Sequence, residues 1–200
     1  MDYLYQSKRE YPMEWSILEA MNTLAETISL SDMQIQSICS AASLSKPTFY
    51  RYFKNKNHAV RWHMKQAGMA STCKIGYRFS WKEGFGIMAS CLLELGNLYR
   101  SFDAEDPNNP FSGNDFTSNL WVRSLKQTLT ERKRILLTDE LEFQLLAAAD
   151  IYQGAVGRWQ KSGFDDPATF VSLCDRTVPE PLYGLLNEPS NPATPPVSLC

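Results

Sequence analysis

The chain has 200 residues, 44% of them hydrophobic, and a formal net charge of −2 at pH 7. This length can bury a sizeable core in one or two domains. The apolar runs are shorter than the roughly 18 residues that a membrane-spanning helix needs, and the first residues lack the apolar stretch of a signal peptide. We therefore expect a cytoplasmic protein that does not enter the membrane.

Five cysteines are widely spaced, odd in number and free of any Cys-x-x-Cys pair. This pattern predicts neither a disulfide framework nor a structural zinc site. We interpret Cys39, Cys91 and Cys174 as small buried apolar residues, with a redox-sensing thiol as the alternative.

The small net charge hides a strong asymmetry along the chain. Residues 31–82 hold nine basic and one acidic side chain, a net charge of +8, whereas residues 1–30 carry −3 and residues 83–200 carry −7. A basic segment within an acidic protein is typical of a surface that binds a polyanion. The alternative is an ordinary solvated basic face.

The N-terminal third predicts a mobile or weakly helical arm over residues 1–13, followed by three helices. Apolar residues that recur every three or four positions favour helices at about 14–28 and 33–42. The turn Ser43-Leu44-Ser45 separates the second helix from a third at about 46–53, and a fourth begins at 56. Pro47 suits the first turn of the third helix, while Phe49 and Phe53, four residues apart, should anchor it inward. The outward arc would then hold Thr48, Arg51 and Tyr52, with Tyr50 beside it.

The remaining sequence also predicts helices, at about 80–99, 115–134 and 139–161 and from Pro167 onward. The helix at 139–161 has a second apolar stripe, formed by Phe143, Ala147, Ile151 and Ala155. A helix that is apolar on two sides needs two partners, and a second subunit is one of them. We expect an all-α protein, with a helix-turn-helix domain at 1–66, a helical domain at 67–187 and a disordered tail at 188–200.

Residues 36–56 combine a helix, a turn and a short second helix, the arrangement that places an α-helix in the major groove of double-stranded DNA. Lys46 and Arg51 supply positive charge, and Lys56 would meet a phosphate at the start of the fourth helix. Gln36 can reach a base edge. Hydroxyl groups that can donate to phosphate come from Ser45, Thr48, Tyr50 and Tyr52. Lys8 and Arg9 could reach along the DNA backbone or into the minor groove.

Each of these residues also has a structural interpretation without DNA. The tyrosines could pack around the small helical bundle, and the cations could form a solvated surface. Some helix-turn-helix shapes do not bind DNA. The set as a whole favours DNA contact over these alternatives.

Residues 14–67 resemble the N-terminal domain of TetR-family transcriptional regulators. The resemblance rests on Ile38-Cys39-Ser40-Ala41-Ala42-Ser43-Leu44-Ser45, then Lys46-Pro47-Thr48-Phe49-Tyr50-Arg51-Tyr52-Phe53, then Lys54-Asn55-Lys56. It implies DNA contacts by Thr48, Tyr50, Tyr52 and Lys56, with Gln36, Lys46 and Pro47 at positions that vary with the operator. The chain departs from the family pattern at Ser43, Cys39 and Gln34, where a turn glycine, an alanine and a threonine are usual.

The resemblance also implies a dimeric, ligand-responsive regulator, most often a repressor, that binds a near-palindromic operator. Its homodimer would form through the C-terminal helices, at about 139–177, and an unknown small-molecule effector would bind in the C-terminal bundle. Candidate residues for that pocket are Phe85, Met88, Leu92, Trp121, Tyr152 and Trp159, although aromatic residues at helical spacing are more often plain core.

Two other functions compete with DNA reading. The chain could be a TetR-like co-regulator that acts through protein partners. An enzyme is less favoured because His58 and His63 diverge on one helix and cannot share a metal. The sequence also lacks the nucleophile-elbow, P-loop and dinucleotide-binding motifs. We therefore expect no catalytic residues, no cofactor and no metal.

Overall fold

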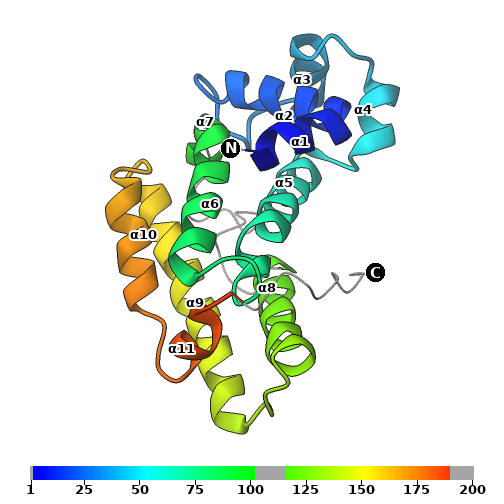
Figure 1. Ribbon diagram of the computed structural model, residues 1–200. Coiled ribbons are helices and arrows are strands. Elements are labelled where there is room, and N and C mark those ends of the chain that lie inside the picture. Colours follow the sequence, from blue (N-terminus) through cyan, green and yellow to red (C-terminus); the bar gives the residue numbers. More distant parts are fainter. Residues whose placement is uncertain (1, 102–115, 190–200) are drawn as a thin grey trace. The chain divides into compact units, whose positions relative to one another are not determined.

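The computed structural model describes residues 2–101 and 116–189. Its regular elements there are helices, with one isolated bridge between Ile75 and Phe79 (Figure 1). The predicted all-α fold is therefore confirmed. The chain divides into two compact units, the first made of Met1–Ala67, Ser90–Asp115 and Val156–Asp165, and the second of Gly68–Ala89, Phe116–Ala155 and Asp166–Cys200.

The first unit is built mainly from short N-terminal helices. They are α1 (Asp2–Glu10), α2 (Pro12–Leu24), α3 (Ile35–Ala41), α4 (Lys46–Tyr52), most of α5 (Lys56–Ala70) and α7 (Gly96–Arg100), with the last turns of α6 (Trp81–Glu94) and α9 (Asp139–Lys161). The core forms where α2 meets the helix-turn-helix, and its largest buried side chains include Trp15, Leu18, Met21, Phe49 and Phe53. Burial of each such side chain contributes about 1.5–3 kcal/mol.

The N-terminal segment, predicted as a mobile or weakly helical arm, is a helix that docks on the rest of the first unit. Trp15 of α2 donates its indole N–H to the buried Ser7 hydroxyl at 2.9 Å. The Lys8 ammonium pairs with Glu19 at 2.8 Å and Glu94 at 2.7 Å, and it lies 5.0 Å from the centre of the Trp15 ring. These contacts hold the Lys8 ammonium against the protein, so it does not point toward a DNA groove as the sequence suggested.

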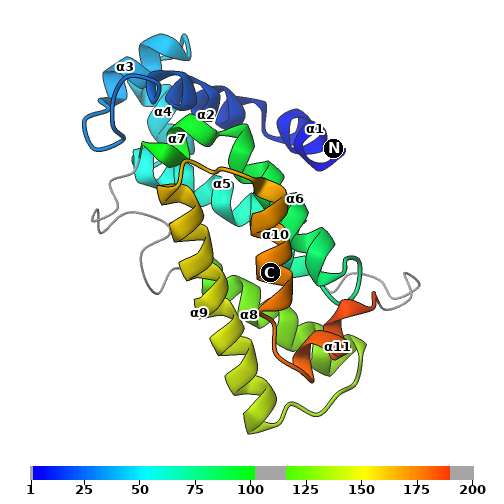
Figure 2. The ribbon, with the colours of Figure 1, turned by 90° about the vertical axis from the view of Figure 1, so that its left-hand side faces the viewer.

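The second unit contains the end of α5, η1 (Thr72–Lys74), most of α6, α8 (Phe116–Gln127), η2 (Thr128–Arg132), most of α9, α10 (Pro167–Arg176) and α11 (Leu182–Asn187). Two buried tryptophans join its elements. Trp81 donates to the Tyr183 carbonyl and Trp121 to the Thr72 carbonyl, each at 3.1 Å. Figure 2 shows α10 running beside α9, and the rings of Tyr152 and Phe170 lie 6.4 Å apart between them.

Several helix boundaries differ from the predicted ones. The helix predicted at 80–99 breaks at Leu95, where the Leu98 amide is capped by the Asn22 side chain at 2.9 Å. The helix predicted at 115–134 ends at Gln127 and continues as a π-helical turn, η2. α10, by contrast, begins at Pro167 as predicted, after Asp166, whose carboxylate accepts from the Thr169 amide at 3.1 Å. Residues 190–200 of the predicted tail lie outside the described residues. Among the described helices, none is long and apolar enough to cross a lipid bilayer.

Candidate nucleic-acid interface

The turn between α3 and α4 sets the angle of the second helix. Ser43 has a φ of 55°, in the left-handed region where glycine is usual. The Leu44 amide donates to the Cys39 carbonyl at 2.9 Å and thereby closes the end of α3. A non-glycine residue in this conformation costs roughly 1–2 kcal/mol, which the contacts around the turn must offset.

The cap and the anchors of α4 follow from its sequence. Ser45 is the N-cap, and its hydroxyl accepts from the Thr48 amide at 3.2 Å and lies 2.8 Å from the Thr48 hydroxyl. Pro47 occupies the first turn of the helix, where a backbone N–H would have no partner within the helix. Proline, which lacks this N–H, is therefore tolerated there. Phe49 and Phe53 are almost completely buried, as their spacing predicts. The helix is therefore fixed on one side and presents the other to solvent.

The solvent side of α4 differs in part from the predicted outward arc of Thr48, Arg51 and Tyr52 with Tyr50 beside it. Tyr50 is 54% exposed, and Arg51 is exposed with its guanidinium carbon 5.3 Å from the centre of the Tyr52 ring. Lys46 and Pro47 are exposed at the start of the helix. We name the four residues Lys46, Pro47, Tyr50 and Arg51 the exposed arc of α4. Thr48 and Tyr52 are half-buried beside this arc.

The start of α5 is held by a reciprocal cap. Asn55 accepts from the His58 amide at 2.8 Å, and the His58 ring nitrogen Nδ1 accepts from the Lys54 amide at 3.1 Å. This bond requires Nδ1 to be unprotonated, because a protonated nitrogen cannot accept. Lys54 itself is exposed beside α4. Lys54 was not among the predicted DNA contacts, although its position in the basic run Lys54-Asn55-Lys56 could have indicated such a contact.

Lys56 is bound to the protein's own backbone. Its ammonium donates to the Ser31 carbonyl at 2.6 Å and to the Met33 carbonyl at 2.9 Å. These bonds tie the start of α5 to the loop that precedes α3. Lys56 therefore holds the helix-turn-helix together, whether or not it also meets a phosphate. Gln36, by contrast, is exposed on α3.

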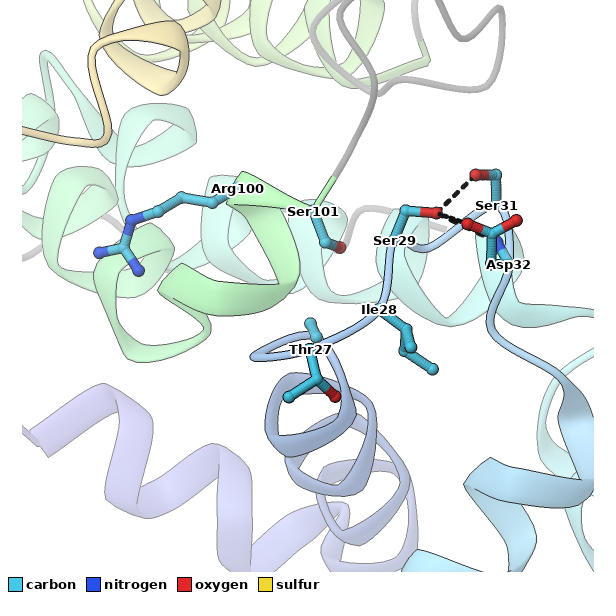
Figure 3. Close-up of a pocket in the computed structure, with 8 residues that line it drawn as sticks. Thr27, Ile28, Ser29, Ser31, Asp32, Arg100 and Ser101 are labelled. Carbon is cyan, nitrogen blue, oxygen red and sulfur yellow. Dashed lines mark hydrogen bonds between the residues drawn. The ribbon is translucent and has the colours of Figure 1, made fainter.

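An open hollow of about 480 Å³ lies beside the loop that Lys56 holds (Figure 3). Figure 3 shows Ser29 at its centre, with the Ser29 hydroxyl 2.6 Å from the Asp32 carboxylate and 2.7 Å from the Ser31 hydroxyl. Arg100, on α7, points away from this group and donates to the Gly163 carbonyl and the Asn97 amide oxygen. The Ser29 and Ser31 hydroxyls and the Asp32 carboxylate are thus bonded to one another and order the loop.

The six predicted effector-pocket residues are all buried, but they do not all belong to one unit. Phe85, Trp121 and Tyr152 form an aromatic cluster in the second unit, where the Phe85 and Tyr152 rings stack with centres 4.6 Å apart. Met88 belongs to the same unit. The other two, Leu92 and Trp159, belong to the first unit, where Trp159 packs edge-on against Phe164.

Burial shifts the pKa values of one histidine and two cysteine thiols in the direction that favours their neutral forms. His63 is buried, and burial, assisted by the Lys8 charge, lowers its pKa to about 3. Burial raises the pKa of Cys73 to about 11 and that of Cys91 to about 12. Such thiols are inert toward oxidants because the thiolate is the reactive form. Among the described residues, no three acidic, histidine or cysteine side chains gather as metal ligands do.

Comparison with known proteins agrees with the geometry of α3 and α4. Residues 17–58 match the model of the bacterial regulatory proteins of the TetR family. No curated protein matches the chain significantly. The solved structure of a protein described as dihydroxyacetone kinase operon activator DhaS has a similar fold, with a TM-score of 0.58 at 16% identity over 83% of this chain and 96% of that one. The family match and the observed helix-turn-helix together identify residues 17–58 as a TetR-type DNA-binding domain.

Proposed function

We propose that the chain is a ligand-responsive repressor that binds a near-palindromic operator as a homodimer in the cytoplasm. The exposed arc of α4 is the observation that carries this proposal. It sits on a helix anchored by two buried phenylalanines and capped by Ser45, so its side chains are presented rigidly. A preorganised helix loses little entropy when it enters the major groove.

In this proposal each residue around α4 contacts the part of the DNA that suits its side chain. Lys46 and Arg51 neutralise phosphates, while Tyr50 makes phosphate and base contacts from the centre of the arc. Gln36 reads a base edge from α3, since glutamine pairs with adenine in the major groove. The Ser45 hydroxyl donates to a phosphate. The contacts that the family resemblance adds come from Thr48, Tyr52 and Lys56, with Pro47 at a position that varies with the operator.

The homodimer of this proposal forms through α9 and α10. Among the described residues, the second stripe of α9 is only partly covered, since Phe143 is 70% exposed and Ile151 is 41% exposed. Leu146 of α9 and Leu173 of α10 are also exposed. Large apolar side chains that recur along neighbouring helices are typical of a subunit interface.

Light scattering after gel filtration tests the dimer. The 22.8 kDa chain should elute with twice its mass. A Phe143→Glu variant should be monomeric because it buries a charge in the interface. Leu136→Glu is the matched control: Leu136 is 82% exposed but lies outside α9 and α10, so this variant should stay dimeric. A monomeric wild-type protein would refute the homodimer.

The effector of this proposal binds at the aromatic cluster of Phe85, Trp121 and Tyr152, with Met88 beside it. Flat aromatic faces and a thioether suit an apolar or aromatic ligand. Regulation then requires only that the ligand binds the DNA-competent and the DNA-incompetent conformations with different affinity.

One observation competes with the proposal that the protein represses transcription. The structure of similar fold is described as an operon activator, and a partner-assisted co-regulator is the second candidate function. Selection of sites from randomised duplex DNA by the purified protein separates these functions. A repressor or activator should enrich a palindrome, and transcription from a promoter that contains this site then gives the sign. A co-regulator should enrich no sequence unless its partner is added.

A further inference from the structure

One loop and one helical turn of the second unit gather positive charge outside the DNA-reading helix. Lys74 ends η1, Arg78 lies in the loop that follows, and Arg132 ends η2. The guanidinium carbon of Arg132 lies 4.2 Å from the centre of the Tyr77 ring, in the same loop. Lys74 and Arg78 belong to the basic segment at residues 31–82, which was predicted to bind a polyanion. They fold into the second unit, apart from the helix-turn-helix.

The loop from Lys74 to Phe79 is a fixed piece of backbone. The amides of Arg78 and Phe79 both donate to the Lys74 carbonyl, at 3.0 and 3.2 Å, and the Gly76 amide donates to the Phe79 carbonyl at 2.9 Å. Gly76 has a φ of +86°, and a Cβ there would lie 2.4 Å from a methyl carbon of Leu186. Only glycine fits this position, so the loop presents its side chains from a defined conformation.

The position of Arg132 is set by the π-helical turn η2. η2 is a π-helical turn of five residues, in which the Lys133 amide donates to the Thr128 carbonyl at 3.0 Å. The extra residue of a π-turn rotates the side chains after it by about 100° relative to an α-helix. Such turns are rare and occur frequently at functional sites.

The acidic side chains nearest in sequence to these cations, Glu131 and Glu83, accept hydrogen bonds from neutral groups. Glu131 accepts from the Gln127 amide at 2.9 Å, and Glu83 accepts from both the amide and the hydroxyl of Ser80. Within the described residues, neither Lys74 nor Arg78 forms a salt bridge. Burial, together with the Arg78 charge, lowers the pKa of Lys74. The cluster therefore holds a half-buried cation beside another cation, an arrangement that an anion would stabilise.

We propose that Lys74, Arg78 and Arg132 bind the oxyanion of a small molecule, either a carboxylate or a phosphate group, with the Tyr77 hydroxyl as a further donor. The Arg78 guanidinium can form two parallel bonds to such a group, and the Lys74 ammonium adds a point charge. The site lies in the second unit and does not depend on the proposed DNA contacts. It differs in chemistry from the aromatic cluster, which suits apolar groups.

Titration of the ¹⁵N-labelled full-length protein with inorganic phosphate, and separately with succinate, tests this site. Ionic strength is held constant with sodium chloride, and the amide signals of Gly76 and Phe79 are followed. Saturable shifts should appear with at least one of the two anions. Arg78→Gln should weaken binding at least about tenfold, because it removes a charged donor pair. Lys82→Gln removes an exposed cation of the same basic segment and should leave the affinity unchanged.

The two anions distinguish the chemistry of the ligand. Saturation by phosphate alone assigns a phosphate group, and saturation by succinate alone assigns a carboxylate. A Lys74→Gln variant, checked for unchanged helical circular dichroism, should also lose binding. Shifts that do not saturate with either anion, or equal affinity in Arg78→Gln and Lys82→Gln, would overturn the proposal.

Discussion

Replacement of Lys56 by methionine should destabilise the first unit, because the Lys56 ammonium donates to two backbone carbonyls. A hydrogen bond from a charged donor contributes about 1.5–3 kcal/mol. Lys56 is half-exposed, and solvent screening removes roughly half or more of the sum of two such bonds. We therefore expect a loss of about 2 kcal/mol in the free energy of unfolding, which lowers Tm by roughly 4–8 °C for a chain of this size.

Urea denaturation followed by circular dichroism measures this change, with Lys54→Met as the matched control. Lys54 is exposed two residues earlier, and its side chain takes part in none of the salt bridges of the described residues. That variant should keep the wild-type stability within about 0.5 kcal/mol. Equal stability of the two variants would refute the structural role of Lys56. If Lys56 also contacts a phosphate, Lys56→Met should lower the slope of log affinity against log salt by about one unit.

Three further predictions concern the packing and protonation of the first unit. Phe49→Ala should cost about 3–5 kcal/mol in urea unfolding, because it empties a fully buried site. Ser43→Gly should stabilise by roughly 0.5–1 kcal/mol by relieving its positive φ, whereas Ser40→Gly, within α3, should destabilise. Burial holds the folded-state pKa of His63 at about 3, so below pH 6.5 only the unfolded state binds this proton. Stability should therefore fall by about 2 kcal/mol between pH 6.5 and 5, a loss that His63→Phe should remove.

The parts of the fold that local signals specify could be predicted from the sequence. Ser45 and Pro47 mark the start of α4, and the spacing of Phe49 and Phe53 identifies its buried side. The second apolar stripe of α9 was also visible, because period and burial are linked within one helix. The TetR-family resemblance and the all-helical fold are confirmed.

The features that were missed depend on contacts between distant residues. Lys8 pairs with Glu94, which is 86 residues away, so no local pattern indicates a docked α1. The carbonyl partners of Lys56 lie 23 and 25 residues before it. The division of the basic segment between two units likewise follows from tertiary packing, which places Lys74 and Arg78 outside the first unit.

The most direct test of the DNA-reading claim is the affinity for the selected DNA site relative to random DNA, measured at one salt concentration for the wild type and a Tyr50→Ala/Arg51→Ala variant. Both residues are exposed, so this change should leave stability nearly unchanged. The loss of base and phosphate contacts should lower the affinity for the selected site roughly a hundredfold and reduce its ratio to the non-specific affinity. A variant that retained the wild-type preference for the site would contradict the assignment of α4 as the DNA-reading helix.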